Sequence, residues 1–203
     1  MSSDQTTTTT TPRRHPRFTM QRCETRDQVA RCMAIRYDVF CVEQGYDPKI
    51  EVDELSLQSD HFLLTEVDPN DGSIKDVATL RCFADPRRSL LKLGRFAVVA
   101  HARGTGAGRH LERSFVEFVA TRRNARSSAT AATVQGSSSS GGGGGGSFCD
   151  KVTKGKDEVR IVAFSQSIAV GFYLKLGWQT RGEEFLEEGQ PHVEIFKDVE
   201  LLP

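Results

Sequence analysis

The sequence has little apolar material and no long apolar run. Its hydrophobic content is 37%, below the usual range for a globular chain. It contains no stretch of 18 apolar residues, and its N-terminal segment lacks the apolar core of a signal peptide. These absences argue against a membrane span and predict a cytoplasmic protein. A nuclear or mitochondrial location stays open, because the N-terminal segment is rich in Ser and Thr with basic residues nearby, although Asp4 counts against a presequence.

The chain also lacks a charge excess and paired cysteines. Lys and Arg number 27, as do Asp and Glu, so the basic excess typical of nucleic-acid binders is missing. The five cysteines are odd in number and include no CxxC pair, which favours neither a disulfide framework nor a metal site. We interpret Cys32 and Cys41 as core residues of a protein in a reducing compartment.

Two segments have too few apolar residues to fold. Residues 1–17 are rich in Ser and Thr, and residues 124–156 contain a serine run followed by Gly141 to Gly146. Neither can offset an ordering entropy of roughly 1–2 kcal/mol per residue. The sequence therefore predicts a disordered tail over residues 1–17 and a single domain over residues 18–203, with a disordered insertion at about 124–156.

The remaining sequence alternates between helical and strand patterns. A helix is predicted over residues 27–42, with Val29, Met33, Tyr37 and Phe40 on its inner face. A second helix follows residue 108, and a third covers residues 166–176 with Ile168, Ala169, Phe172 and Leu176 facing inward. Strands are predicted at residues 61–67, 76–83, 92–99, 159–164, 178–186 and 192–197. This order predicts an α/β fold, with a mixed sheet flanked by helices.

A glycine segment between a predicted strand and a predicted helix carries the main functional signal. It reads Arg103-Gly104-Thr105-Gly106-Ala107-Gly108. Glycines let the backbone approach an anion, and the free N–H groups at a helix start point towards it. A dinucleotide site would need a third glycine at position 109, where Arg109 stands, and an acidic residue about 20 positions on. The GxxxxGK[ST] pattern of ATP sites is also absent, so the segment predicts a different phosphate ligand.

Two motifs resemble those of the GCN5-related N-acetyltransferase (GNAT) superfamily. The pattern [Q/R]-x-x-G-x-[G/A] is matched by Arg103, Gly106 and Gly108. Further on, Ala169, Phe172-Tyr173 and Leu176-Gly177-Trp178 match a second motif in the expected order. Residues 36–45 and Pro191-His192 are most similar to the ElaA/YjcF branch. Gln166 departs from the pattern, since many members have Asn there.

The resemblance implies a three-layer α/β/α sandwich with a mixed, mostly antiparallel sheet that is splayed at the cofactor site. It implies acetyl-CoA as acyl donor and a primary amine, on a small molecule or peptide, as acceptor, with direct transfer in a ternary complex. Homodimers are common for this fold. The implied cofactor-binding residues are Phe96, Ala97, Val98, Arg103, Gly104, Thr105, Gly106, Ala107, Gly108, Arg109, Gln166 and Phe172.

Amine acylation needs an acid and a base. An alkyl amine with a pKa near 10 is neutral in only about one molecule per thousand at pH 7, so a positioned base helps. The resemblance assigns Tyr173 to protonating the leaving thiolate. The base is either Glu43 or His192, since an unperturbed imidazole titrates near neutral pH. Glu43 is close to an acidic segment (Asp47, Glu51, Asp53, Glu54) that would line an amine pocket. The same acidic segment is equally explained as a solvated loop.

Two other functions compete with an N-acetyltransferase. One is a non-catalytic module that binds acyl-CoA, which the intact Tyr173 argues against. The other is an enzyme like the acyl-homoserine-lactone synthases, because Arg36, Phe40 and residues 51–53 also resemble their N-terminal pattern. The complete glycine motif favours CoA as donor, and therefore the acetyltransferase.

Overall fold

The computed structural model describes residues 17–50, 54–68, 71–124 and 146–203. The predicted tail up to residue 16 and most of the predicted insertion, residues 125–145, lie outside these ranges. The described part is built on a seven-stranded sheet with the order β1-β2-β3-β4-β5-β7-β6. The strands are β1 (Arg17–Arg22), β2 (Asp60–Val67), β3 (Ile74–Asp85), β4 (Leu90–Val98), β5 (Glu158–Gln166), β6 (Gln179–Glu187) and β7 (Gln190–Glu200).

Only one pair of neighbouring strands in this sheet is parallel. β4 and β5 pair in parallel from Leu90 with Arg160 to Leu93 with Ala163, and every other neighbouring pair is antiparallel. Both strands continue beyond this short ladder, β4 to Val98 and β5 to Gln166. The sheet is therefore mixed, mostly antiparallel and splayed between β4 and β5, which confirms the predicted architecture.

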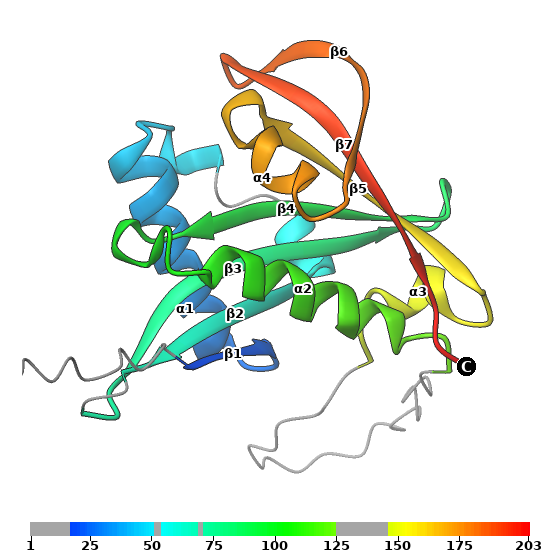
Figure 1. Cartoon of the computed structure of the whole chain (residues 1–203), viewed down its shortest axis with the longest axis horizontal. Coiled ribbons are helices and arrows are strands. Elements are labelled where there is room, and N and C mark those ends of the chain that lie inside the picture. Colours follow the sequence, from blue (N-terminus) through cyan, green and yellow to red (C-terminus); the bar gives the residue numbers. More distant parts are fainter. Residues whose placement is uncertain (1–16, 51–53, 69–70, 125–145) are drawn as a thin grey trace, which may run out of the picture.

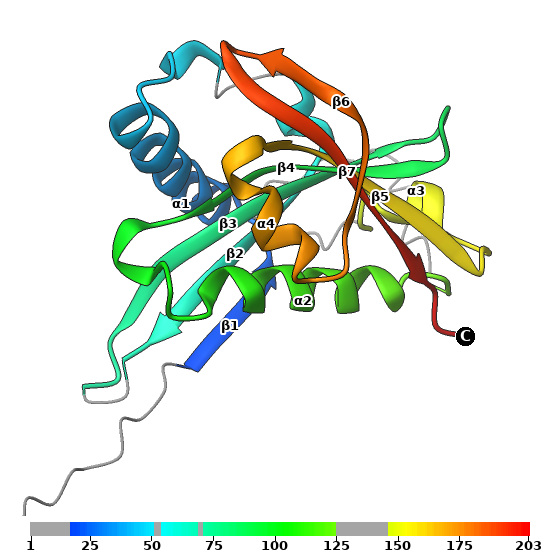
Figure 2. The same cartoon turned by 45° about the horizontal axis from the view of Figure 1, so that its top comes forward.

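Helices cover both faces of the sheet (Figures 1 and 2). On one face lie α2 (Ala107–Ala120) and α4 (Val170–Leu174). On the other lies α1 (Arg26–Arg36), which continues into the π-helix η1 (Tyr37–Glu43). The short elements are η2 (Pro48–Ile50), η3 (Glu54–Gln58), η4 (Ala100–Ala102), α3 (Asp150–Thr153) and η5 (Ser167–Ala169). Among the described residues, no helix combines the length and the apolar character that a membrane crossing needs.

Alternation along the strands divides the core into two layers. In β2, Phe62 and Leu64 belong to the larger core beneath α2, whereas Leu63 faces the smaller core beneath α1. This follows from the period of two that a strand imposes on its side chains. Phe62 packs edge-to-face on Phe115 of α2, with ring centroids 5.2 Å apart. The α1 layer is completed by Cys32, Ile35, Val39 and Ala97.

One buried carboxylate ties α2 to β7 and to the segment after α4. The side chain of Glu112 is fully buried. Its Oε1 accepts hydrogen bonds from Trp178 Nε1 at 2.7 Å and Lys197 Nζ at 3.0 Å. Lys197 Nζ also donates to the Leu176 carbonyl at 2.7 Å. The buried negative charge is therefore compensated by a partly exposed ammonium group.

Removing that ammonium should destabilise the protein. Lys197→Met keeps the length of the side chain but leaves Glu112 buried without a cation, so we expect the free energy of unfolding to fall by about 2–3 kcal/mol. Urea denaturation of the wild type and the variant measures the difference. The double variant Glu112→Gln with Lys197→Met should recover part of the loss. A single variant as stable as the wild type would show that the pair contributes nothing.

The inner faces of two predicted helices are wrong in part. In the first helix the buried residues are Cys32, Ile35, Arg36 and Val39, whereas Tyr37 is 51% exposed. The helix carries apolar residues on more than one face, and the π-helical turn from Tyr37 onward changes the angle between successive residues. In the helix after β5, Ile168 is 92% exposed because residues 167–169 form a 3₁₀ turn before α4 begins.

The predicted boundaries of the domain and its insertion need two corrections. Arg17, predicted as the last residue of the tail, is the first residue of β1, a strand that was not predicted and that pairs with β2 along its whole length. Residues 146–156 include α3, with Cys149 and Val152 in the core. Asp60 Oδ2 accepts hydrogen bonds from Ser147 Oγ at 2.6 Å and from Cys149 N at 3.1 Å. The prediction of an insertion relied on the mean composition of residues 124–156, which is polar. The few apolar residues near its end are enough to pack this part of the chain into the core.

Candidate acyl-CoA site

A cavity of about 670 Å³ opens where β4 and β5 diverge. This volume is in the range typical of small-molecule sites. Its walls come from β3, β4, β5, η1, the glycine segment, α4 and the turn between β6 and β7. The predicted site residues that line it are Phe96, Ala97, Val98, Arg103, Gly104, Gly108, Gln166, Phe172, Tyr173 and His192. Glu43, Thr105, Gly106, Ala107 and Arg109 are not part of its lining.

The glycine segment forms the start of α2. Gly104 and Gly106 have φ angles of 77° and 100°, a region that residues with a side chain rarely adopt. Gly106 is the residue before the first helical turn. The first four N–H groups of a helix have no partner within it, and the helix dipole adds about half a positive charge there. Beside a cavity that reaches Gly104 and Gly108, these groups can bind a phosphate.

Gly108 has a packing role. A Cβ atom at this position would lie 3.4 Å from Phe172 Cζ and 3.5 Å from Val98 Cγ2. The missing side chain therefore lets the start of α2 approach β4 and α4 closely. This contact brings the two sequence motifs, which lie far apart along the chain, to one end of the cavity.

Arg103 and Glu43 form an ion pair with each other. Arg103 Nη2 lies 2.5 Å from Glu43 Oε2, and Arg103 Nε donates to the Val98 carbonyl at 3.0 Å. The sequence analysis gave the two residues separate roles, as phosphate ligand and as base. In the structure the charge of each is already compensated by the other. Both side chains remain partly exposed beside the cavity, at 48% and 33%.

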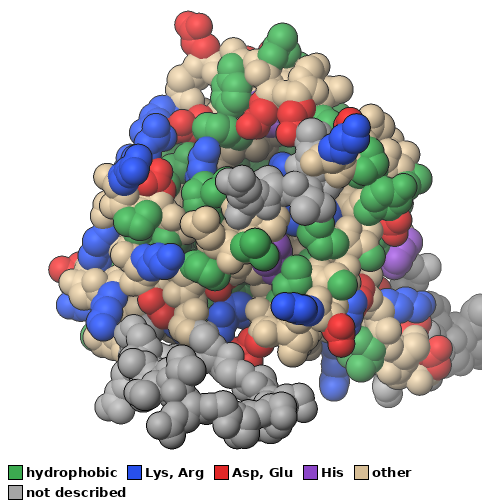
Figure 3. Space-filling model, turned by 180° about the vertical axis from the view of Figure 1, so that it is seen from behind, with side chains coloured by type: hydrophobic (Ala, Val, Ile, Leu, Met, Phe, Trp, Pro, Cys, Tyr) green, Lys and Arg blue, Asp and Glu red, His purple; other side chains and the backbone are tan. Residues whose placement is uncertain are grey.

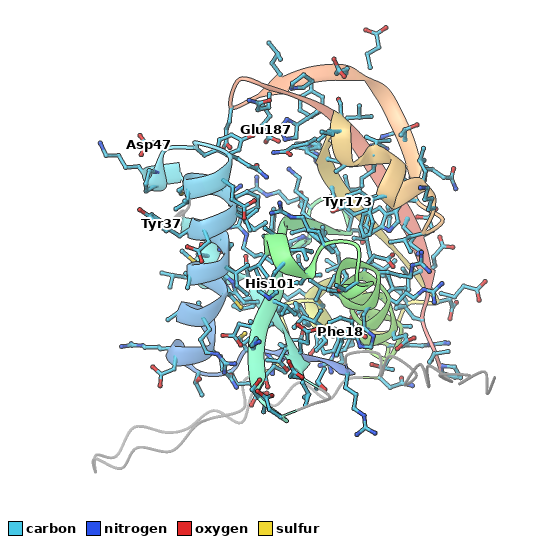
Figure 4. The ribbon with its side chains drawn as sticks, turned by 60° about the vertical axis from the view of Figure 1, so that its left-hand side comes forward. Phe18, Tyr37, Asp47, His101, Tyr173 and Glu187 are labelled. Carbon is cyan, nitrogen blue, oxygen red and sulfur yellow. The ribbon has the colours of Figure 1, made fainter. Side chains whose placement is uncertain are left out.

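The predicted acidic amine pocket is not formed by the described residues of that segment. Glu43 is paired, and neither it nor Asp47 lines the cavity. Figure 4 shows Tyr37 on the outer side of its helix and Asp47 in the loop beyond the end of that helix, both turned away from Tyr173. Glu51 and Asp53 lie outside the described residues, as does the side chain of Glu54. For Asp47, the interpretation as a solvated loop residue therefore holds.

Tyr173 lies in a cluster of aromatic rings. Its centroid is 5.0 Å from that of Phe172, 5.4 Å from that of Trp178 and 5.9 Å from that of Phe96, all in edge-to-face geometry. Burial raises the pKa of Tyr173 above its ordinary value, and the nearby charge of Glu112 raises it further. The phenol therefore keeps its proton at neutral pH, as a proton donor must.

This raised pKa should be visible in an alkaline titration. We expect the difference in absorbance at 295 nm between the wild type and Tyr173→Phe to develop only above pH 10, the ordinary value for tyrosine. The unfolded chain would release this proton first. The corresponding stability is therefore complete below about pH 10 and is lost as the pH rises above it. A difference that develops fully below pH 10 would contradict the buried placement.

His192 faces the cavity from β7. Its Nδ1 donates to the Gln190 carbonyl at 2.9 Å, and its Nε2 lies 3.9 Å from Glu187 Oε2. Because the carbonyl can only accept, the proton of the neutral ring stays on Nδ1. Nε2 is then free to accept a proton. Glu187 also lines the cavity, and Figure 4 shows it at the end of β6.

Other cavity residues were missed from the sequence. Gln166 Nε2 donates to Gln44 Oε1 at 3.0 Å and to the Tyr46 hydroxyl at 3.1 Å, which links the end of β5 to the segment after η1. No motif marks Tyr46, and Gln44, although it lies in the segment 36–45, was given no role. The cavity is also lined by Arg81, Lys92 and Arg95. The alternation along β3, in which Leu80 and Cys82 belong to the core, could have placed Arg81 on the opposite face.

Similar proteins were found among solved structures. The chain resembles a Lactobacillus plantarum protein assigned as an N-acetyltransferase (18% identity, TM-score 0.62, 90% of this chain and 98% of that one). It resembles ElaA of Escherichia coli (19%, 0.59, 90% and 99%) and an acyl-CoA N-acyltransferase of Pseudomonas aeruginosa (22%, 0.56, 90% and 99%). At this identity the likeness concerns the fold, which is that of the GNAT acetyltransferases, with ElaA among its neighbours.

Comparison of sequences alone finds fewer similarities than comparison of structures. No family model matches the chain. One relative, the protein YyaT of Bacillus subtilis, is 38% identical over 50 residues, which is 25% of this chain. The match spans about a third of that protein's length, 34%.

Proposed function

We propose that this protein transfers an acyl group, normally acetyl, from acyl-CoA to a primary amine. One observation carries the proposal: a single cavity at the β4/β5 splay reaches from the glycine segment to Tyr173 and His192. The cavity would thus place the phosphates of the donor at the start of α2 and the reacting groups beside the proposed acid, Tyr173, and the proposed base, His192. The likeness to an acyl-CoA N-acyltransferase supports the choice of donor.

Donor binding would use the backbone more than side chains. The pyrophosphate would accept hydrogen bonds from the N–H groups at the start of α2. The parts of β4 and β5 beyond Leu93 and Ala163 do not pair with each other, so their backbone groups are available to the extended arm of CoA. Arg103 would then act through its contact with Val98, holding β4 in place.

The reaction would proceed in one ternary complex. His192 Nε2 accepts the proton of the ammonium group, directly or through water, and the amine nitrogen attacks the thioester carbonyl. Backbone N–H groups near Phe96 to Val98 stabilise the oxyanion. The C–S bond breaks as the carbonyl reforms, and Tyr173 donates its proton to the leaving thiolate. The attacking nitrogen gives up its second proton, which passes through solvent to restore Tyr173. His192 then releases the proton it took from the ammonium group to solvent, so each cycle releases one proton.

Release of free CoA tests this proposal. We expect turnover with acetyl-CoA and an amine panel of amino acids, polyamines, amino sugars and peptides. Faster turnover with long-chain acyl donors would favour the synthase alternative. Tight binding of acetyl-CoA with no turnover on any amine would favour the non-catalytic module. A cytoplasmic location and a homodimer stay predictions.

A further inference from the structure

The cavity has a basic floor. Arg81 on β3 and Lys92 and Arg95 on β4 all line it. In the β3/β4 register Phe83 is opposite Lys92, and Arg81 is opposite Gly94. Residues opposite each other share a face, as do residues two apart. Arg81 and Lys92 therefore project from the same face of the sheet into the same cavity.

Lys92 is the informative member of this group. Among the residues that the structure describes, no carboxylate forms an ion pair with it. Its Nζ lies 4.2 Å from the centroid of the Phe164 ring, which also lines the cavity. A half-buried ammonium over an aromatic ring has lost part of its hydration without gaining a counter-ion. Such a group favours a ligand that brings a negative charge.

The acidic residues in the described part of the lining are Glu187 and Glu188, at the β6–β7 turn. Glu187 lies close to His192. Within that described part, the cations are therefore on β3 and β4 and the carboxylates are at the turn. On the face seen in Figure 3, by contrast, basic and acidic side chains are interspersed.

We infer that the acceptor is an amine that also carries a carboxylate, that is, an amino acid or a related amino-carboxylate. The carboxylate binds Lys92. The ammonium group binds between Glu187 and His192, where the base can remove its proton. This inference rests on the proposed acyl transfer and adds the class of acceptor to it.

The experiment compares amino acids with their amides, which differ in charge but hardly in size. Glycine, β-alanine, γ-aminobutyrate and several α-amino acids are each tested against the matching amide with acetyl-CoA as donor. Taurine and phosphoethanolamine test whether other anionic groups are accepted. Binding of the N-acetylated products and their amides is measured separately by calorimetry, which needs no turnover. The variants are Lys92→Met, Lys92→Arg and, as a control, Lys154→Met at the exposed end of α3.

We expect kcat/KM for at least one acid to exceed that for its amide by about tenfold or more, because hydrogen bonds to charged groups are the strong ones. Lys92→Met should remove this preference mainly through KM, Lys92→Arg should retain part of it, and the control should leave it unchanged. Turnover with equal or better use of amides would overturn the inference and leave the acyl transfer standing. Product acids that bind in a Lys92-dependent way without any turnover would support the anion site and refute the transferase. Neither binding nor turnover of any acid would refute the inference outright.

Discussion

Gly106→Asp should abolish binding of acetyl-CoA. The substitution places a carboxylate at the residue that precedes α2, where the free N–H groups would otherwise meet the pyrophosphate. Repulsion between like charges and loss of the close backbone approach should weaken affinity by about 100-fold or more, roughly 3 kcal/mol. Isothermal titration of CoA into the wild type and the variant measures the change.

Two controls separate charge from backbone strain. Gly106 has a φ angle of 100°, so any side chain strains it, although a Cβ there would meet nothing within 4 Å. Gly106→Ala introduces the strain without the charge and should weaken CoA binding much less than the aspartate. Gly155→Asp places the same side chain at a glycine with a φ angle of 71° outside the cavity lining and should leave CoA binding unchanged. Unchanged affinity in Gly106→Asp would mean that the phosphate binds elsewhere.

Tyr173→Phe should lower kcat by about 100-fold or more, with little change in CoA binding. The hydroxyl is the proposed proton donor, and a positioned acid contributes typically 10²–10⁴-fold. The ring packing against Phe96, Phe172 and Trp178 is retained, since phenylalanine keeps the aromatic shape. Steady-state kinetics together with CoA titration separate the two effects.

Varying the acidity of the leaving thiol supplies a control for this prediction. Donors whose thiol is more acidic than that of CoA need less help from an acid, so Tyr173→Phe should be nearer to the wild type with them. Tyr37→Phe, on the outer side of η1, should behave as the wild type in every assay. Wild-type rates for Tyr173→Phe with acetyl-CoA would assign the proton donor to another group.

Apart from β1 and α3, the order of the main elements and one end of the site could be predicted from the sequence. The strand, glycine segment and helix follow from strong local patterns, and the structure has β4, the turn and α2 in these places. The ladder that ends at Leu93 and Ala163 is a property of pairing between strands far apart in the sequence. No local pattern encodes it, and only the resemblance indicated the splay.

The acceptor side could not be predicted, because it depends on which charges meet. The acidic segment suggested a cationic acceptor, but Glu43 is opposite Arg103, 60 residues away in the sequence. Lys92 belongs to no motif and became informative only through its position over Phe164 and the lack of an ion-pair partner among the described residues. The prediction of which helical residues face inward was wrong in part for a different reason. It assumed the period of about 3.6 residues of an α-helix, and π- and 3₁₀-helical turns have other periods.

The anchors around the insertion have a practical consequence for engineering. Arg122 and Asp150 form a two-pronged ion pair at 2.7 and 2.9 Å, and Gly155 N donates to the Arg123 carbonyl. Residues 122–123 and 150–155 therefore lie in contact with each other, and none of the four residues named here lines the cavity at the β4/β5 splay. In general, doubling the length of a connection between two fixed ends costs only about 0.6 kcal/mol in closure entropy. A reporter, an affinity tag or a second domain could therefore be inserted between residues 124 and 146 without altering either end of the protein.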